Sequence, residues 1–184
     1  MNNEAKPIRV WDLPTRLFHW SLVASFAIAF LTAESEKLRD VHVAAGYTLA
    51  GLMVFRLLWG FVGGAHSRFA EFLPTPGKVL GYLKSLIEGK PQHYVGHNPA
   101  GAVAIFLLLG FGIVAAASGW ATYEDIGGHF MVELHEGASN GMMAIVAIHI
   151  VGVIVSSWLH QENLVIAMIT GWKKLRTTHE NPAG

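Results

Sequence analysis

The chain has 184 residues, of which 52% are hydrophobic and 14% are charged, with 13 acidic and 13 basic side chains. A mean hydropathy of +0.40 is typical of a membrane protein, and the balanced charge without a dense basic patch argues against a nucleic-acid partner. The absence of cysteine excludes disulfides, cysteine-ligated iron–sulfur clusters and covalently attached c-type haem.

Four long stretches are nearly free of charge and predict membrane-spanning helices at about 15–33, 41–64, 99–122 and 135–160. Each stretch approaches the roughly 20 residues that cross the hydrocarbon layer, and the first is the shortest. We therefore expect an all-α fold, an integral-membrane four-helix bundle made by a single domain over residues 1–184. No small-residue cleavage pattern follows the first helix, so we expect it to be retained rather than removed as a signal peptide.

The basic residues are distributed unevenly along the chain. Most of them precede the first helix, lie between the second and third, or follow the fourth: Lys6, Arg9, Arg16, Arg68, Lys78, Lys84, Lys90, Lys173, Lys174 and Arg176. Lys37 and Arg39, between the first and second helices, fit this distribution less well. The segment between the third and fourth helices has acidic residues and no Lys or Arg. The positive-inside bias therefore predicts an N-in/C-in topology, with both termini and the middle loop in the cytoplasm.

Two shorter segments carry an apolar pattern of their own. Between Thr75 and Gly89, apolar residues recur at helical spacing beside lysines, and the segment "ENLVIAMITGWKK" follows the fourth helix. This pattern predicts short interfacial helices on the cytoplasmic membrane surface. The alternative is that both helices pack against the ends of the membrane-spanning helices.

Ten histidines are present, and their positions separate them into two groups. Six fall in predicted loops, tails or a helix end, where we expect solvated or interfacial side chains: His66, His93, His97, His129, His160 and His179. The other four lie in or at the edge of the predicted spans: His19, His42, His135 and His149. An ionisable residue within a span is costly, so these four are candidate functional residues.

The expected topology places these four histidines at two depths. The first helix starts in the cytoplasm, which makes His19 an inner residue, and the second starts outside, which makes His42 an outer one. On the fourth helix His135 precedes His149 by close to four turns, about 21 Å, on the same face. The natural pairs are His42 with His135 and His19 with His149. Two imidazoles from different helices can supply both axial ligands of a haem iron, so the pairs predict two haems stacked across the membrane.

Residues near the pairs are consistent with this interpretation. Gly46, Gly137 and Gly141 leave room for a flat macrocycle, although small residues also serve helix packing. Arg56 lies about four turns after His42 and can pair with a propionate of the inner haem. The alternative for Arg56 is a side chain that extends to the membrane interface.

Zinc is a weaker interpretation of the same histidines. Each pair supplies two ligands, and the only carboxylates at a matching depth are Glu133 and Glu136 beside the outer pair. The inner site would lack the ligands that zinc requires. A histidine-dependent metal-ion transporter nevertheless remains the alternative function.

The chain resembles the bacterial cytochrome b-561 family, which includes the b-type cytochrome subunits of nickel–iron hydrogenases. The resemblance is carried by "VWDLPTRLFHW", "HVAAGYTLAGLMVFRLLWGFVG", "GHNPAGA", "LHEGASNGMMAIVAIHIVGVIVSSWLH" and "ENLVIAMITGWKK", which follow one another in family order over nearly the whole chain. It implies two non-covalent b-type haems, with His19, His42, His135 and His149 at the ligand positions.

The resemblance also implies a function. A multi-pass protein of the bacterial inner membrane would pass electrons between a periplasmic-side partner and the quinone pool. The partner would be a c-type cytochrome or the subunits of a hydrogenase or other dehydrogenase. Related subunits bind quinone beside an Asn at the start of the third helix, which corresponds to Asn98 here, although Asn98 is equally suited to be a helix cap. The direction of electron flow, the type of quinone, self-association and enzymatic activity of its own are left open.

Overall fold

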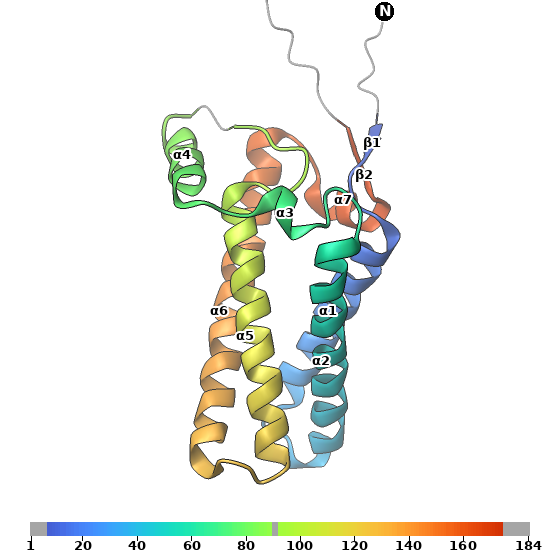
Figure 1. Cartoon of the computed structure of the whole chain (residues 1–184), viewed down its shortest axis with the longest axis vertical. Helices are drawn as coiled ribbons and strands as arrows, with labels where there is room; N and C mark the ends of the chain where they lie inside the picture. Colours follow the sequence, from blue (N-terminus) through green and yellow to red (C-terminus); the bar gives the residue numbers. More distant parts are fainter. Residues whose placement is uncertain (1–6, 90–91, 175–184) are drawn as a thin grey trace, which may run out of the picture.

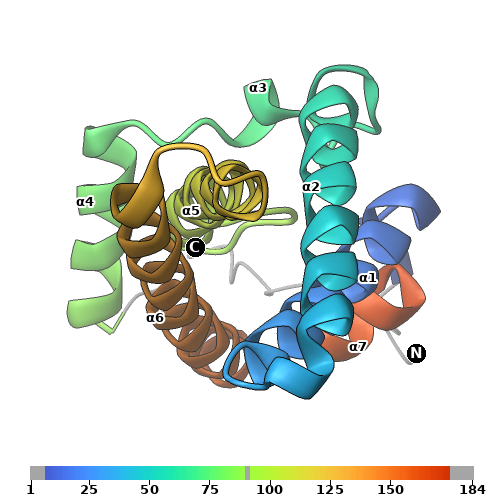
Figure 2. The same ribbon diagram turned by 90° about the horizontal axis from the view of Figure 1, so that it is seen from below.

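Four long helices run side by side and form the body of the molecule in the computed structural model, which describes residues 7–89 and 92–174 (Figures 1 and 2). They are α1 (Leu13–Thr32), α2 (Arg39–Val62), α5 (Pro99–Tyr123) and α6 (Gly128–His160). All four are long and apolar enough to cross a membrane, which confirms the predicted bundle. The residues Lys6, Lys90, Arg176 and His179 lie outside the described residues.

Local sequence explains where the membrane helices begin. Asp12 caps α1 and is followed by Pro14 in the first turn, and Asn98 caps α5 immediately before Pro99. Both patterns satisfy the free amides of a first turn and pre-set its backbone. At the opposite end of the bundle the connections are short: η1 (Glu36–Leu38) joins α1 to α2, and residues 124–127 join α5 to α6.

The fourth membrane helix begins earlier than predicted, at Gly128 instead of residue 135. The acidic residues of the segment 123–136 indicate a loop there, although the apolar Phe130, Met131 and Val132 lie among them. Helical spacing nevertheless lets His129 pair with Glu133 at 3.2 Å, one turn later, on an exposed face. The reversal before it uses Gly127 at φ +78°, a conformation that favours glycine.

The bundle is built from two helical hairpins. α1 packs on α2, α5 packs on α6, and α2 joins the hairpins by packing on α5. The shared core consists of Ala29, Ala45, Leu49, Met53, Leu109 and Met142. Large apolar side chains face outward, among them Phe61 and Trp158, which are 74% and 78% exposed. Such a surface is typical of contact with lipid.

The remaining helices lie at the inner end of the bundle, which the basic residues predict to face the cytoplasm. They are α3 (Phe69–Phe72), α4 (Pro76–Ile87) and α7 (Leu164–Thr170). α4 lies across the bundle axis and packs beside α5 (Figure 2). The amphipathic helix predicted here is confirmed: Thr75 caps it, and Gly89 follows it at φ +69°. Tyr82 is buried toward the bundle, whereas Leu80 and Leu83 are exposed.

A two-stranded sheet at the same end was not predicted. Strand β1 (Pro7–Arg9) pairs antiparallel with β2 (Trp172–Lys174), which joins the two ends of the described chain (Figure 1). Val10 and Trp11 continue from β1 into a small core with Ala167 of α7. Strands of three residues are too short for an alternating pattern to be recognised in the sequence.

Candidate functional site

The outer histidines lie face to edge across the bundle. α2 carries His42 in its first turn and α6 carries His135, and their ring centres are 6.0 Å apart with an interplanar angle of 89°. A metal–imidazole bond is about 2 Å long, so two imidazoles on opposite sides of one metal have ring centres roughly 6 Å apart. The observed spacing fits that arrangement.

Main-chain carbonyl groups fix the orientation of both outer rings. The Nδ1 atom of His42 lies 2.8 Å from the oxygen of Ala29 on α1, and that of His135 lies 2.8 Å from the oxygen of Ala115 on α5. A carbonyl oxygen only accepts, so each Nδ1 carries the proton and donates. Each Nε2 is then left with its lone pair, which is the tautomer that a metal ligand requires. These donors fit a bis-imidazole haem site.

A glycine on α5 makes room for the His135 ring. A Cβ atom at Gly119 would lie 2.8 Å from His135 Cε1, which is closer than real contacts allow. Sequence analysis missed Gly119, since nothing distinguishes it from other small residues in this apolar helix. A Cβ atom at Gly46 or Gly137 would meet nothing within 4 Å, whereas one at Gly141 would lie 2.5 Å from the Phe111 ring.

The inner histidines come from α1 and α6. The pairing of His19 with His149 stays a prediction. The Nδ1 atom of His19 is buried and has no hydrogen-bond partner among the described residues. Since buried polar atoms are normally paired, this ring has hydrogen-bonding capacity that the chain itself leaves unused. His19 can therefore interact with a bound group.

Arg56 is enclosed by protein and does not extend to the interface. It is 4% exposed. Its Nη1 donates to the carbonyl oxygen of Ser67 at 3.0 Å, and its guanidinium lies 4.6 Å from the centre of the Phe69 ring. A positive charge is thus buried at the inner end of α2. Its contacts are one main-chain acceptor and an aromatic face, so other N–H groups of the guanidinium can still donate hydrogen bonds.

Asp12 holds the start of α1 against the end of α2. Its carboxylate accepts hydrogen bonds from Thr15 N and Ser67 Oγ at 2.8 Å, and from Trp59 Nε1 and Gly64 N at 3.3 Å. Burial alone would raise the pKa of Asp12, but these hydrogen bonds outweigh burial and lower it. The cap of α1 therefore remains charged and also fixes the loop that positions Arg56.

His97 is not the solvated histidine that the sequence suggested. Its ring lies 4.6 Å from that of Trp11 and 4.4 Å from that of Phe72, centre to centre, and its Nδ1 is buried without a hydrogen-bond partner among the described residues. Burial, together with the positive charge of Arg56, lowers the pKa of His97 to about 3. The expectation was wrong because the loop folds back over the inner end of the bundle.

Asn98 acts as a helix cap. Its Oδ1 accepts from the Gly101 amide at 2.7 Å, and its side chain also borders a small cavity at the inner end of the bundle. The side-chain amide group is not used by the cap and can still donate. Both the cap and a ligand contact are compatible with this position.

Each predicted level of the bundle supplies two histidines. Among residues 7–89 and 92–174, no three His, Cys, Asp or Glu side chains are grouped so that they could hold a metal ion. A carrier for bare ions needs more ligands than two imidazoles at each level. The paired histidines suit a group that occupies the remaining coordination positions itself.

Comparison with known proteins agrees with this chemistry. The family model described as "Prokaryotic cytochrome b561" matches residues 10–171. Three similar proteins are each named "Probable Ni/Fe-hydrogenase B-type cytochrome subunit". The Bradyrhizobium diazoefficiens protein is 26% identical, in a match that covers 92% of this chain and 87% of that protein. The Azotobacter vinelandii protein is 25% identical, in a match that covers 92% of this chain and 89% of that protein. The Azotobacter chroococcum protein is 30% identical over 64% and 60%. No solved structure matches.

Proposed function

Because this chain belongs to the prokaryotic cytochrome b561 family, we propose that it holds two b-type haems and carries electrons across the membrane between an outer redox partner and the quinone pool. Membership of the family makes it a membrane electron-transfer protein that binds haem b. The number of haems, the quinone and the partner are the parts that we propose.

The outer pair is the observation that carries the proposal. His42 and His135 are held 6.0 Å apart, and each donates its Nδ1 proton to a carbonyl of another helix. When bound, each haem supplies a one-electron iron couple, and two imidazole ligands leave no iron position open to oxygen. The role of the protein is to hold, orient and enclose the haems, which supports electron transfer over chemistry on oxygen.

The inner level would hold the second haem between His19 and His149. Arg56 is buried at this end of the bundle with donors to spare, which supports pairing with a haem propionate. Asn98 lies at the same end and would bind quinone through its side-chain amide. A quinone there would exchange protons with the cytoplasm, since the charge bias places this end inside.

The outer partner would be a redox protein of the periplasmic side. The similar proteins are named as subunits of nickel–iron hydrogenases, so a hydrogenase is the first candidate, followed by another dehydrogenase or a c-type cytochrome. Acidic side chains such as Glu133 are exposed at the outer end, beside the His42–His135 pair.

The quinone assignment is tested with purified holoprotein and duroquinol. We expect duroquinol to reduce the haems of the wild-type protein, and Asn98→Leu to slow this reduction by about tenfold or more while dithionite still reduces both haems. Asn98→Asp, which keeps the cap acceptor but removes the amide donor, separates the two roles. A wild-type protein that dithionite reduces but duroquinol does not would contradict the quinone function.

A further inference from the structure

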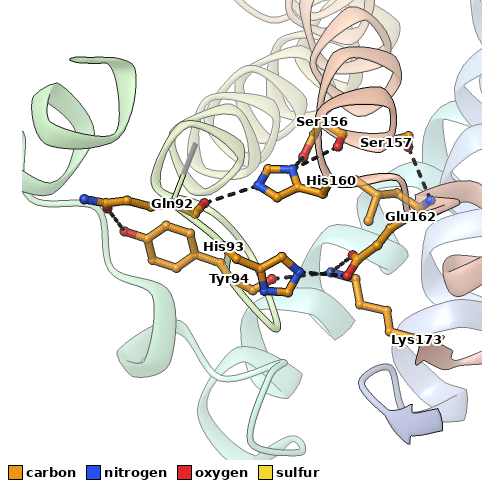
Figure 3. A network of polar contacts seen from close by, with 9 residues as sticks. Gln92, His93, Tyr94, Ser156, Ser157, His160, Glu162 and Lys173 are labelled. Carbon is orange, nitrogen blue, oxygen red and sulfur yellow. Dashed lines mark hydrogen bonds and ion pairs between the residues drawn. The ribbon is translucent and has the colours of Figure 1, made fainter. Parts of the chain in front are cut away.

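A polar cluster lies at the inner end of the bundle, next to Asn98 but outside the histidine pairs. It joins the segment before α5, the end of α6, the turn into α7 and strand β2 (Figure 3). Its titratable members are His93, Tyr94, His160, Glu162 and Lys173, which border a cavity of about 30 Å3. A polar cavity of that size has room for a water molecule.

Glu162 is the centre of the cluster. Its Oε1 is 2.7 Å from His93 Nε2, and its Oε2 is 3.0 Å from Lys173 Nζ. The His93 side chain is 42% exposed, whereas those of Glu162 and Lys173 are 9% and 5% exposed. One hydrogen bond therefore connects an imidazole at the surface to a carboxylate inside the protein.

The charge of Glu162 is maintained inside the protein. Burial alone would raise its pKa, but the hydrogen bonds from His93 and Lys173 outweigh burial and lower the pKa below its usual range. Lys173 also donates to the carbonyl oxygen of Tyr94 at 3.4 Å. The cluster thus holds an ionised carboxylate that is hydrogen-bonded to the His93 imidazole.

His160 is arranged to accommodate two protonation states. Its Nε2 is 3.3 Å from the Gln92 carbonyl oxygen, and its Nδ1 is 3.0 Å from the Ser156 carbonyl oxygen and 3.5 Å from Ser156 Oγ. A neutral ring can donate from Nε2 and accept from the Ser156 hydroxyl, whereas a protonated ring can donate to both carbonyls. The ring centres of His160 and His93 are 5.3 Å apart.

The cavity connects these groups to the proposed quinone site. Asn98 borders the same cavity as His93, His160 and Glu162. Reducing one quinone to quinol consumes two electrons, which the cytochrome delivers, and two protons, which the cytoplasm must supply; oxidation of quinol releases both.

We propose that His93, Glu162 and His160 form the proton route between the cytoplasm and a quinone at Asn98. This proposal rests on the proposed quinone function. His93 is the entry point, Glu162 the internal acceptor, and His160 with a water in the cavity completes the route. Lys173 keeps Glu162 ionised and acts as a positioning residue.

The test measures the reduction of the haems by duroquinol in the purified holoprotein, with His93→Ala as the principal variant. We expect the rate of haem reduction to fall by about tenfold or more, while the dithionite-reduced spectra stay unchanged. The rate should recover when imidazole is added as a soluble proton carrier. The matched control is His129→Ala, which removes the imidazole of the exposed His129–Glu133 pair at the opposite end of the bundle.

Glu162→Gln should slow the same reaction, but it leaves the buried Lys173 cation without its carboxylate and can destabilise the fold. The double variant Glu162→Gln with Lys173→Met removes both charges and guards against this outcome. Rates equal to wild type in His93→Ala, or a loss that imidazole does not restore, would overturn the proton route. A wild-type protein that does not react with duroquinol would instead overturn the quinone function on which the route rests.

Discussion

At the scale of single residues, the outer site is defined by the protons on two imidazoles. The helix carbonyls of Ala29 and Ala115 fix the tautomers of His42 and His135 before any group binds. A histidine ring that is already held in one tautomer and one orientation loses little conformational freedom when it binds a haem iron. The four histidines should therefore behave as two independent pairs and not as one cluster.

The pairing is tested by single alanine substitutions. His42→Ala and His135→Ala should each remove the same, outer haem, and His19→Ala and His149→Ala should each remove the other one. About half of the haem should remain in every variant, because each pair lies on its own level, about 21 Å from the other. Redox titration of the remaining haem identifies it. Loss of the same haem in His42→Ala and His149→Ala would contradict the pairing.

Gly119 should matter for the outer site through the space that it leaves. Gly119→Ala places a Cβ 2.8 Å from the His135 ring, so the ring must move and its hydrogen bond to Ala115 must weaken. We expect weaker retention of the outer haem, measured as haem content after detergent washing. Gly110→Ala on the same helix meets nothing within 4 Å and is the matched control. Equal haem content in both variants would show that the ring adjusts.

Arg56 should set the potential of the inner haem through its charge. Removing a buried positive charge stabilises the oxidised, more positive state, so Arg56→Leu should lower one midpoint potential. We expect a shift on the order of 60 mV, which corresponds to a tenfold change for a one-electron couple. Arg56→Lys should retain part of the potential but not the contact geometry of the guanidinium. If both midpoint potentials are unchanged, Arg56 only makes its contacts with Ser67 and Phe69 and does not influence the inner haem.

At the scale of elements, α4 lies across the end of the bundle with two different faces. Tyr82 and Ser85 are buried against the protein, whereas Leu80, Leu83 and Ile87 are exposed. This helix therefore combines the two alternatives left by the sequence, since it packs on a neighbouring helix and also presents an apolar edge. That edge is suited to the membrane interface.

The orientation of α4 can be measured because the chain has no cysteine of its own. A spin label on Leu83→Cys should be more accessible to oxygen, which dissolves in lipid, than to a water-soluble paramagnetic reagent. Lys84→Cys, one residue further on the same helix, should show the reverse preference. The same accessibility at both positions in vesicles would mean that α4 does not lie along the interface.

At the scale of the whole molecule, the protein should contain two haems per chain. Both should be extracted by acidified organic solvent, because no cysteine can attach them. The measurement is the ratio of haem to protein in the purified sample. One haem per chain would leave one histidine pair without its ligand and contradict the two-level arrangement.

The bundle was predictable because each span is a long apolar stretch that is nearly free of charge and close to the length that lipid requires. The start of α6 was missed because acidic residues such as Glu124, Asp125 and Glu133 indicated that the loop extends to residue 134. The enclosed position of His97 and the network around Asp12 were missed for another reason. They depend on which distant segments meet at the inner end, and neither composition nor spacing encodes those contacts.

The β1–β2 pairing has a consequence for the order of biosynthesis. β1 precedes all four membrane helices along the chain, whereas its partner β2 follows them. The Val10 amide likewise waits for the Gly171 carbonyl oxygen, to which it donates at 2.8 Å. The contacts among α1, α2, α5 and α6 do not require β2, whereas the inner end is completed only when β2 follows α6 and α7.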